Sequence, residues 1–242
     1  MGIISFIGGI VSGAASVISG IASTVGTAIS TFAAGAVKTM SKVLEVVPEV
    51  MKPSLTRVFE VVSNVIHAFA ELLGIESEED PTVTGVKAEQ ADKKPEDFDS
   101  TQEYIEYLKN DIKLDKEKFA KMSEEEKLGY RAIGLSLETK AVQEKMGVEI
   151  GQDMLDVLAK IKLSDKVDIS ASDLLHIMQT LKKNNITNMD AFAEYLTGKG
   201  NSDRVVTGIV LKEAVKDMEG IEDPQAYLDS MKNAVRQYEE EE

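Results

Sequence analysis

The sequence predicts an all-α protein, and three observations support that prediction. Apolar residues recur at steps of three and four along much of the 242-residue chain, which is the period of an amphipathic helix. The chain has only five prolines and no tryptophan, whereas a β-sandwich needs many short strands and frequent turns. Several periodic segments also begin at a residue that caps helix N-termini and end at glycine.

The predicted organisation has three parts. Residues 1–75 form an apolar helical segment for membrane insertion or assembly, residues 76–99 an acidic flexible linker, and residues 100–242 an acidic soluble helical domain. We expect the first part to be a long Gly/Ala/Ser-rich helix or helical hairpin followed by an amphipathic helix. The last part is expected to be a compact bundle of six or seven short helices.

The first 37 residues contain no ionisable side chain, and Lys38 is the first charge. A single helix of that length would extend about 55 Å, well beyond the ~30 Å of bilayer hydrocarbon. One straight span is therefore not expected. A hairpin of two short passes, a tilted helix that runs into the interface, and a helix packed inside a protein assembly are the three alternatives.

This segment has two distinct faces when it is drawn as a helix. The larger apolar residues form a stripe that we expect to face lipid: Ile3, Ile7, Ile10, Val17, Ile21, Val25, Ile29 and Phe32. Small residues form a second seam that we expect to mediate helix association: Gly9, Gly13, Ser16, Gly20, Ser23, Thr27, Ser30 and Ala34. Small residues at this spacing let two helix backbones approach closely, and hydroxyls can hydrogen-bond across the contact.

An uncharged run of this kind also fits a helix buried on all sides in a multimeric bundle. A cleavable signal peptide is not expected, because the run has no basic n-region and is longer than an h-region. The Met-Gly start suggests N-myristoylation, but Phe6 stands where the pattern has Ser or Thr.

Residues 54–73 read as the amphipathic helix. Ser54 is the expected N-cap, Gly74 the expected stop, and Pro48 and Pro53 mark a kink or boundary before it. Its apolar stripe could lie on a membrane surface or pack back on the first segment. Packing is favoured because the polar face is close to neutral.

The charge of the chain is segregated. Residues 1–75 carry four basic and four acidic residues, so the whole net charge of −15 belongs to residues 76–242. An acidic surface repels phosphate backbones, so no nucleic-acid partner is expected. The chain has no cysteine, which excludes disulfides, thiol catalysis and cysteine-based metal sites. Residues 76–99 lose the helical period and gather Pro, Gly and charged residues, which favours a solvated linker.

After the linker, capping signals mark a succession of helices. Ser100 and Ser123 each begin a capping box, and Asp223 with Pro224 begins the last helix. The further helices expected between these signals are 151–161, 171–184, 188–197 and 203–219. The helix from Ser123 should end near Gly147, the last helix near residue 239, and the run of glutamates after it should be a solvated end.

One local segment resembles a known metal-binding family. Residues 167–181 are similar to the end of an EF-hand calcium loop and its exiting helix. The resemblance implies oxygen ligands at loop positions that here hold Lys162 and Lys166, so no calcium site is expected and Ser170 is predicted to cap an ordinary helix. No zinc-protease, phosphate-loop or nucleophile-elbow motif is present, and His67 and His176 are expected to be packing or surface residues.

No catalytic residue, metal or cofactor is therefore predicted. In composition the chain looks like proteins that are delivered soluble and later enter a membrane, such as phage ejection proteins, pore-forming bacteriocins and secreted translocators. The leading hypothesis is a non-enzymatic, self-associating membrane-active protein, with the lipid bilayer and further copies of itself as partners. The alternative is a structural component of a virion or of a secretion or injection assembly, with the apolar terminus buried among other subunits.

Overall fold

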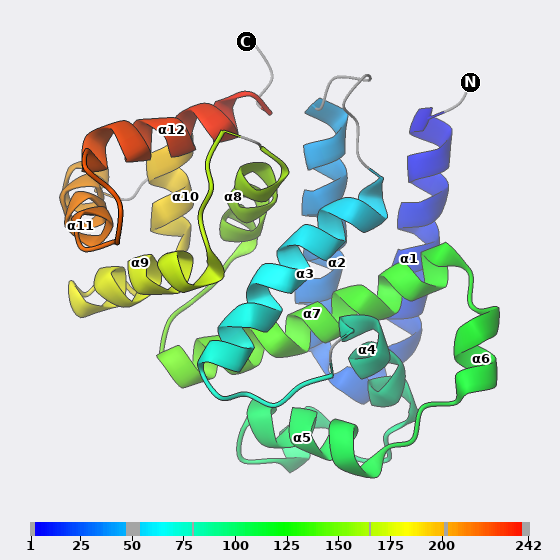
Figure 1. Cartoon of the computed structure of the whole chain (residues 1–242). Helices are drawn as coiled ribbons and strands as arrows, with labels where there is room; N and C mark the ends of the chain where they lie inside the picture. The colour runs from blue at the N-terminus through cyan, green and yellow to red at the C-terminus, as the bar shows by residue number, and fades with distance from the viewer. Residues whose placement is uncertain (1–2, 47–53, 79, 165, 201–202, 239–242) are drawn as a thin grey trace.

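A computed structural model describes residues 3–46, 54–78, 80–164, 166–200 and 203–238. Within these residues the chain forms twelve α-helices, one short 3-10 helix and no strand, apart from an isolated bridge between Glu149 and Asn188 (Figure 1). The all-α class is confirmed. The helices are α1 (Ile3–Val25), α2 (Thr27–Val46), α3 (Leu55–Leu72), α4 (Pro81–Gln90), η2 (Pro95–Asp97), α5 (Thr101–Asp111), α6 (Lys116–Lys121), α7 (Glu124–Met146), α8 (Gln152–Leu163), α9 (Ala171–Lys183), α10 (Asp190–Thr197), α11 (Arg204–Lys216) and α12 (Pro224–Arg236).

Helix α7 lies at the centre of the first seven helices. It begins with the predicted capping box, in which Ser123 accepts from the Glu126 N–H while the Glu126 carboxylate accepts from the Ser123 N–H, and it ends at Gly147 with φ of 63°. Between Leu128 and Thr139 every residue except Arg131 is buried. Helices α1, α2, α3, α4 and α5 all contact it. A helix covered on so many sides has no single apolar stripe.

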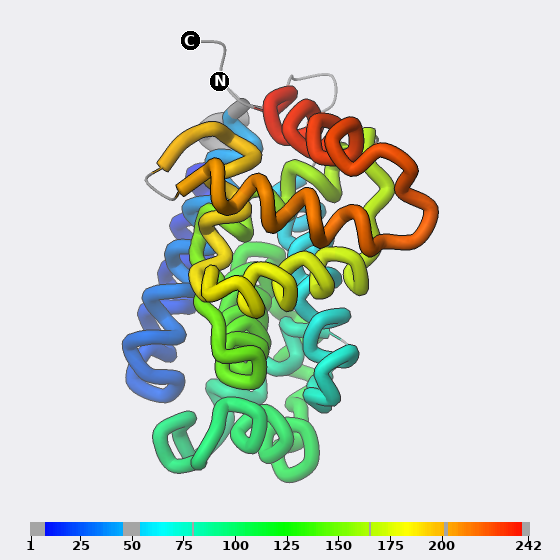
Figure 2. Tube along the Cα trace, turned by 90° about the vertical axis from the view of Figure 1, so that its left-hand side faces the viewer, coloured from blue at the N-terminus to red at the C-terminus, as the bar shows by residue number. Residues whose placement is uncertain are grey.

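Helices α1 and α2 form a hairpin that turns at Gly26 (Figures 1 and 2). Gly26 has φ of 81°, a left-handed conformation that glycine adopts without the steric cost of a Cβ atom. The segment is thus a helical hairpin packed on the protein, and the hairpin of two membrane passes stays a prediction. One side of the hairpin packs on α7, and α2 also contacts α8.

Helix α3 starts at the predicted N-cap, since the Ser54 hydroxyl accepts from the Arg57 N–H at 3.1 Å. Its apolar face is buried, with Phe59 and Phe69 fully inaccessible, and it contacts α7, α8 and α9. The helix was expected to pack back on the first segment; it does contact α2, but most of its packing is on α7, α8 and α9. Pro48 and Pro53, where a kink was expected, lie outside the described residues.

The segment 76–99 differs from the solvated linker that the sequence suggested. Residues 81–90 form α4, which is buried against α7. Asp80 caps this helix and Pro81 occupies its first turn. The tight packing depends on two glycines: a Cβ atom on Gly85 would lie 2.0 Å from the Tyr130 carbonyl oxygen, and one on Gly134 would lie 1.9 Å from the Pro81 carbonyl oxygen. A helix that packs through its backbone needs no stripe of apolar side chains, so the periodicity of the sequence does not reveal it.

Helices α8 to α12 form a second group, on the left in Figure 1. Here the structure confirms that Ser170 caps α9 and that Asp223, with Pro224, starts α12. Helix α11 ends at Lys216, slightly earlier than expected. The final glutamates lie outside the described residues.

Helix α8 joins this group to the rest of the protein, because it contacts α2 and α3 on one side and α10 and α12 on the other. The buried apolar residues form one cluster that extends from Ala14 to Tyr238. Packing is thus continuous across residues 76–99, and the division into a membrane segment and a soluble domain stays a prediction.

Candidate membrane-insertion hairpin

Helix α1 has the length and the composition of a membrane span. Within the described residues, Gly8–Val25 is the one helical window that is long and apolar enough to cross a bilayer, and 22% of that window is buried in the protein. At 1.5 Å per residue, α1 and α2 would each extend about 30–35 Å, close to the thickness of the hydrocarbon core. Helix α2 becomes charged from Lys38 onward, so its apolar part is only its first half.

The apolar stripe predicted to face lipid lies mostly against the protein in this structure. Ile21, Val25 and Ile29 are at most 6% exposed and belong to the core, while Ile10, Val17 and Phe32 are half-buried. Ile3 and Ile7 belong to α1, but their side chains lie outside the described part of the structure. In this structure α7 and its neighbours therefore cover most of the stripe.

The small-residue seam lies mostly on the opposite, exposed side of the hairpin. Its exposed members are Gly9, Ser16, Gly20, Ser23, Thr27 and Ala34. Gly13 is half-buried, and Ser30 is buried, with its hydroxyl donating to the carbonyl oxygens of Gly26 and Thr27. A Cβ atom on Gly9 or Gly20 would meet nothing within 4 Å. Most of the seam is thus free of intramolecular contacts at its surface.

The hairpin approaches α7 closely through small residues. A Cβ atom on Gly13 would lie 2.6 Å from the Cβ of Glu125, and one on Gly129 would lie 2.7 Å from the Cβ of Val17. Near the other end, Gly35 of α2 packs against the side-chain amide of Gln152. That amide donates to the Phe32 carbonyl oxygen at 3.3 Å and accepts from the Thr39 hydroxyl at 3.3 Å.

Charged contacts do not hold the hairpin in place. Among the described residues, no ion pair joins α1 or α2 to the rest of the chain, and the polar links are those of Gln152. The hairpin is therefore attached mainly by apolar packing, which a lipid environment can replace.

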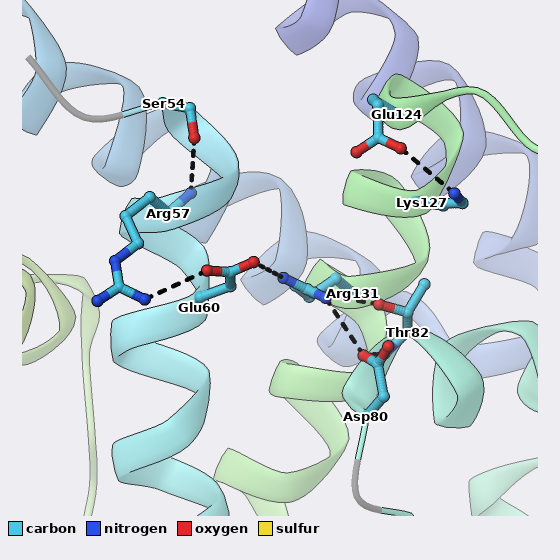
Figure 3. A network of polar contacts seen from close by, with 8 residues as sticks. All are labelled: Ser54, Arg57, Glu60, Asp80, Thr82, Glu124, Lys127 and Arg131. Carbon is cyan, nitrogen blue, oxygen red and sulfur yellow. Dashed lines mark hydrogen bonds and ion pairs between the residues drawn. The ribbon is translucent and has the colours of Figure 1, made fainter.

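The helices on the other side of α7 are joined by charges. Figure 3 shows Arg131 of α7 between Glu60 of α3 and the start of α4. Its guanidinium lies 3.6 Å from Glu60 and 3.4 Å from Asp80, and its Nε donates to the Thr82 hydroxyl at 3.1 Å. This one side chain thus connects three helices, although it was not among the residues predicted from the sequence. The sequence does contain a signal for Arg131, because an arginine is unexpected among the apolar and small residues of a buried helix.

A buried polar cluster links α3 to α7 further along. Glu138 of α7 is fully buried, and its Oε1 lies 3.1 Å from Nδ1 of His67 on α3. The Ser77 hydroxyl lies 3.2 Å from the same Nδ1. In a catalytic triad the serine and the acid bind different ring nitrogens, so this arrangement does not activate Ser77 as a nucleophile. The cluster fits the packing role expected for His67, with Glu138 as a partner that the sequence did not predict.

Among its described residues, the EF-hand-like segment shows no ligand geometry for a metal ion. Within the described residues no group of three or more His, Cys, Asp or Glu side chains is placed to hold a metal ion. Ser170 and Asp173, at the end of the candidate loop, instead form a capping box at the start of α9. The residues that resembled a calcium loop therefore serve as a helix start.

Comparison with known proteins adds no indication of function, so the hairpin remains the main one. No protein-family model, no curated protein and no solved structure matches this chain.

Proposed function

We propose that this protein is a non-enzymatic, membrane-active and self-associating protein whose α1–α2 hairpin leaves the helical body and enters a bilayer. The observation that carries the proposal is that α1 has the length and composition of a membrane span but is mostly not buried. It is apolar and long enough to span, yet only 22% of its span-length window is buried. The core helix of a soluble protein passes the same test of length and composition, but such a helix is mostly buried.

The way in which the hairpin is attached supports its release. Apolar packing and the contacts of Gln152 hold α1 and α2, whereas Arg131 and the Glu138–His67 pair connect α3, α4 and α7. In lipid, Ile21, Val25 and Ile29 would exchange one apolar environment for another, at little cost. The main cost of release is the exposure of the α7 surface that the hairpin covered, so α7 must find a new partner or rearrange.

Self-association would use the exposed seam. With the apolar stripe turned to lipid, Gly9, Gly20 and Ala34 allow another hairpin to approach closely. Hydroxyls of Ser16, Ser23 and Thr27 can then hydrogen-bond between helices and provide a polar path through the assembly. The lipid bilayer and further copies of the chain are the proposed partners, and the acidic helices beyond residue 100 would remain in water.

A reversible covalent lock tests the release of the hairpin. In the variant Gly13→Cys/Glu125→Cys the two Cβ atoms start closer than the ~3.8 Å typical of a disulfide, so a shift of about 1 Å between α1 and α7 suffices to form the bond. The chain has no other cysteine. We expect the oxidised protein to release no dye from liposomes and the reduced protein to release it.

The same protein before and after reduction is its own control, and the single variant Gly13→Cys controls for the new side chain. Equal dye release in the oxidised and reduced states would show that the hairpin does not need to leave α7, and would overturn the proposed mechanism.

A second candidate function is a structural component of a virion or of a secretion or injection assembly. The observation that favours it is the chemistry of the exposed hairpin face, where the described residues before Lys38 present small and hydroxyl side chains and no large apolar one. Such a face suits close packing against protein subunits. This function predicts that the isolated chain associates equally well when oxidised or reduced, and that it shows no preference for lipid.

A further inference from the structure

The start of α8 is held by an aspartate that belongs to another helix. The first N–H groups of a helix have no partner within it, and Gly151, the N-cap of α8, has no side chain to accept from them. Asp190, the first residue of α10, accepts instead: its Oδ1 lies 3.1 Å from the Gly151 nitrogen and 2.9 Å from the Met154 nitrogen. The carboxylate lies directly against the backbone, because a Cβ atom on Gly151 would be 1.9 Å from its Oδ2.

The chain just before α8 is bound to the same part of the protein. The Glu149 N–H donates to the Thr187 carbonyl oxygen, and the Glu149 carbonyl oxygen accepts from the Met189 N–H, both at 2.8 Å. The start of α8 and the start of α10 therefore form one hydrogen-bonded unit, joined through the backbone and through Asp190.

Gln152 lies between the two N–H groups that Asp190 holds, and its side chain contacts the hairpin. Its amide donates to the Phe32 carbonyl oxygen and accepts from the Thr39 hydroxyl, both at 3.3 Å. Among the described residues these two hydrogen bonds are the polar links between α1–α2 and the rest of the chain. Helix α8 lies between α10 and α2 in Figure 1, so the first turn of α8 connects the second group of helices to the hairpin.

We propose that Asp190 positions Gln152, and that α10 thereby controls how readily the α1–α2 hairpin leaves the body. The inference rests on the proposed function and adds a regulator to it. Gln152 reaches the hairpin only while the first turn of α8 stays in place, and both of its bonds are already long for hydrogen bonds. A small displacement of that turn therefore breaks them. Because α10 also contacts α11 and α12, a movement within the second group would reach the hairpin by this route.

The test measures opening of the hairpin in the full chain without lipid. The natural chain has no cysteine, so a single introduced thiol reports on one position. Ala36 of α2 is fully buried and shares a helical face with Phe32 and Thr39, so Ala36→Cys reacts with a thiol reagent when the hairpin opens. Ala234→Cys, at a fully buried position of α12, reports opening of the second group in the same way.

Four variants change the route at different points, and one is a control. Gln152→Met removes the amide and keeps the length of the side chain. Asp190→Ala removes the acceptor, and Gly151→Ala displaces it, although the φ of −96° at Gly151 suits alanine. Asp190→Asn keeps an Oδ1 that can accept from both N–H groups. The control is Val215→Ala, which loosens the buried side of α11 and removes no bond of Asp190.

We expect Gln152→Met, Asp190→Ala and Gly151→Ala each to label Ala36→Cys about tenfold faster, because hydrogen bonds made only by the packed hairpin are lost. Asp190→Asn should label at the natural rate. Val215→Ala should speed labelling of Ala234→Cys and leave Ala36→Cys unchanged. The double variant Gln152→Met/Asp190→Ala should label no faster than Gln152→Met, because Asp190 acts through Gln152.

Three outcomes would overturn the proposal. The first is an unchanged rate at Ala36→Cys in Asp190→Ala. The second is a double variant in which the two accelerations multiply, since Asp190 would then act independently of Gln152. The third is equal acceleration at Ala36→Cys and Ala234→Cys in Asp190→Ala, which would reflect a general loss of stability.

Dye release from liposomes separates this proposal from the proposed function. Both are supported if the variants that speed labelling also speed dye release. If labelling responds as expected but neither the natural chain nor the variants release dye, the membrane function is overturned and the positioning of Gln152 stands. If the Gly13→Cys/Glu125→Cys lock stops dye release but Asp190→Ala leaves labelling unchanged, the membrane function stands and Asp190 is not its regulator.

Discussion

Gly13 of α1 and Glu125 of α7 are in such close contact that a Cβ atom on the glycine would lie 2.6 Å from the Cβ of the glutamate. Two turns along the same helix, Gly20 is exposed and would accept a Cβ atom with nothing within 4 Å. The two glycines belong to one predicted seam, yet only Gly13 is used inside the molecule. The open part of the seam can therefore be tested without disturbing the packing of α1 on α7.

Substitution of Gly20 by leucine should leave the soluble fold intact and abolish assembly in membranes. Stability should be unchanged or should rise by under ~1 kcal/mol, because glycine is a poor helix former. Gly13→Leu should instead lower the free energy of unfolding by about 1–3 kcal/mol through overpacking against Glu125. Urea denaturation measures the stability of both variants, and chemical cross-linking in liposomes measures their assembly. Cross-linked oligomers of Gly20→Leu equal to those of the natural chain would rule out the seam.

The contact of α4 with α7 should depend on two glycines that have no room for a side chain. Gly85→Ala and Gly134→Ala should each lower the free energy of unfolding by about 1–3 kcal/mol or more, because the added methyl group meets a backbone carbonyl. Gly9→Ala in α1 is the matched control and should be neutral or slightly stabilising, since its surroundings are open. Equal stability of all three variants in urea titrations would show that α4 is not packed as described.

Arg131 should contribute more to stability than an exposed arginine with a similar partner. We expect Arg131→Met to lower the free energy of unfolding by about 1.5–3 kcal/mol, because the hydrogen bonds to Asp80 and Thr82 and the ion pair with Glu60 are lost. Arg57→Met removes a pair with the same Glu60 from a side chain that is 60% exposed, and should cost under ~0.5 kcal/mol. Lysine at position 131 should not restore stability, because it lacks the planar fork of arginine.

Breaking the pair of the buried Glu138 and the half-buried His67 should destabilise the protein more than replacing both residues by apolar ones. His67→Leu leaves the fully buried Glu138 carboxyl without its ring partner, and should destabilise the protein by about 3 kcal/mol or more. Adding Glu138→Leu should recover much of that loss, since two apolar residues then pack together. A double-mutant cycle measured in urea gives the coupling, and additive losses would show that the pair does not interact.

Asp190 should make stability depend on pH. Its carboxylate accepts from the N–H groups of Gly151 and Met154 at the start of α8, yet burial raises the pKa of Asp190 above its usual value. The folded protein then binds this proton more tightly than the unfolded chain, so this contribution to stability is lost as pH rises from the unfolded pKa through the folded one.

Asp190→Asn keeps an acceptor and carries no charge, so its stability relative to the natural chain should increase from acidic to neutral pH. Asp190→Ala also removes the titrating group, so its difference from the natural chain should follow the same pH dependence, but it should be about 1–2 kcal/mol less stable than Asp190→Asn because both hydrogen bonds are lost. Denaturation curves at several pH values spanning the acidic to neutral range measure both differences. A constant difference between Asp190→Asn and the natural chain would contradict the raised pKa.

Helices whose start and end signals are local could be predicted without the structure. Ser54, Ser123, Ser170 and Asp223 cap helices as predicted, because capping depends on a side chain and the backbone N–H groups two or three residues later. Gly147 ends α7 for an equally local reason, since it adopts the left-handed conformation. The uncharged composition of the first 37 residues likewise pointed to the segment that forms the α1–α2 hairpin.

Which face of each helix is buried could be learned only from the packing of the folded chain. The helical periodicity of α1 predicted an apolar face and a face of small residues. Whether Ile21 contacts lipid or α7 depends on residues more than a hundred positions away. Helix α4 was missed because it is fixed by contact of its backbone with α7 at Gly85 and Gly134, not by an apolar stripe of its own. Local signals act within a few residues, whereas packing partners and buried ion pairs arise only when distant segments meet.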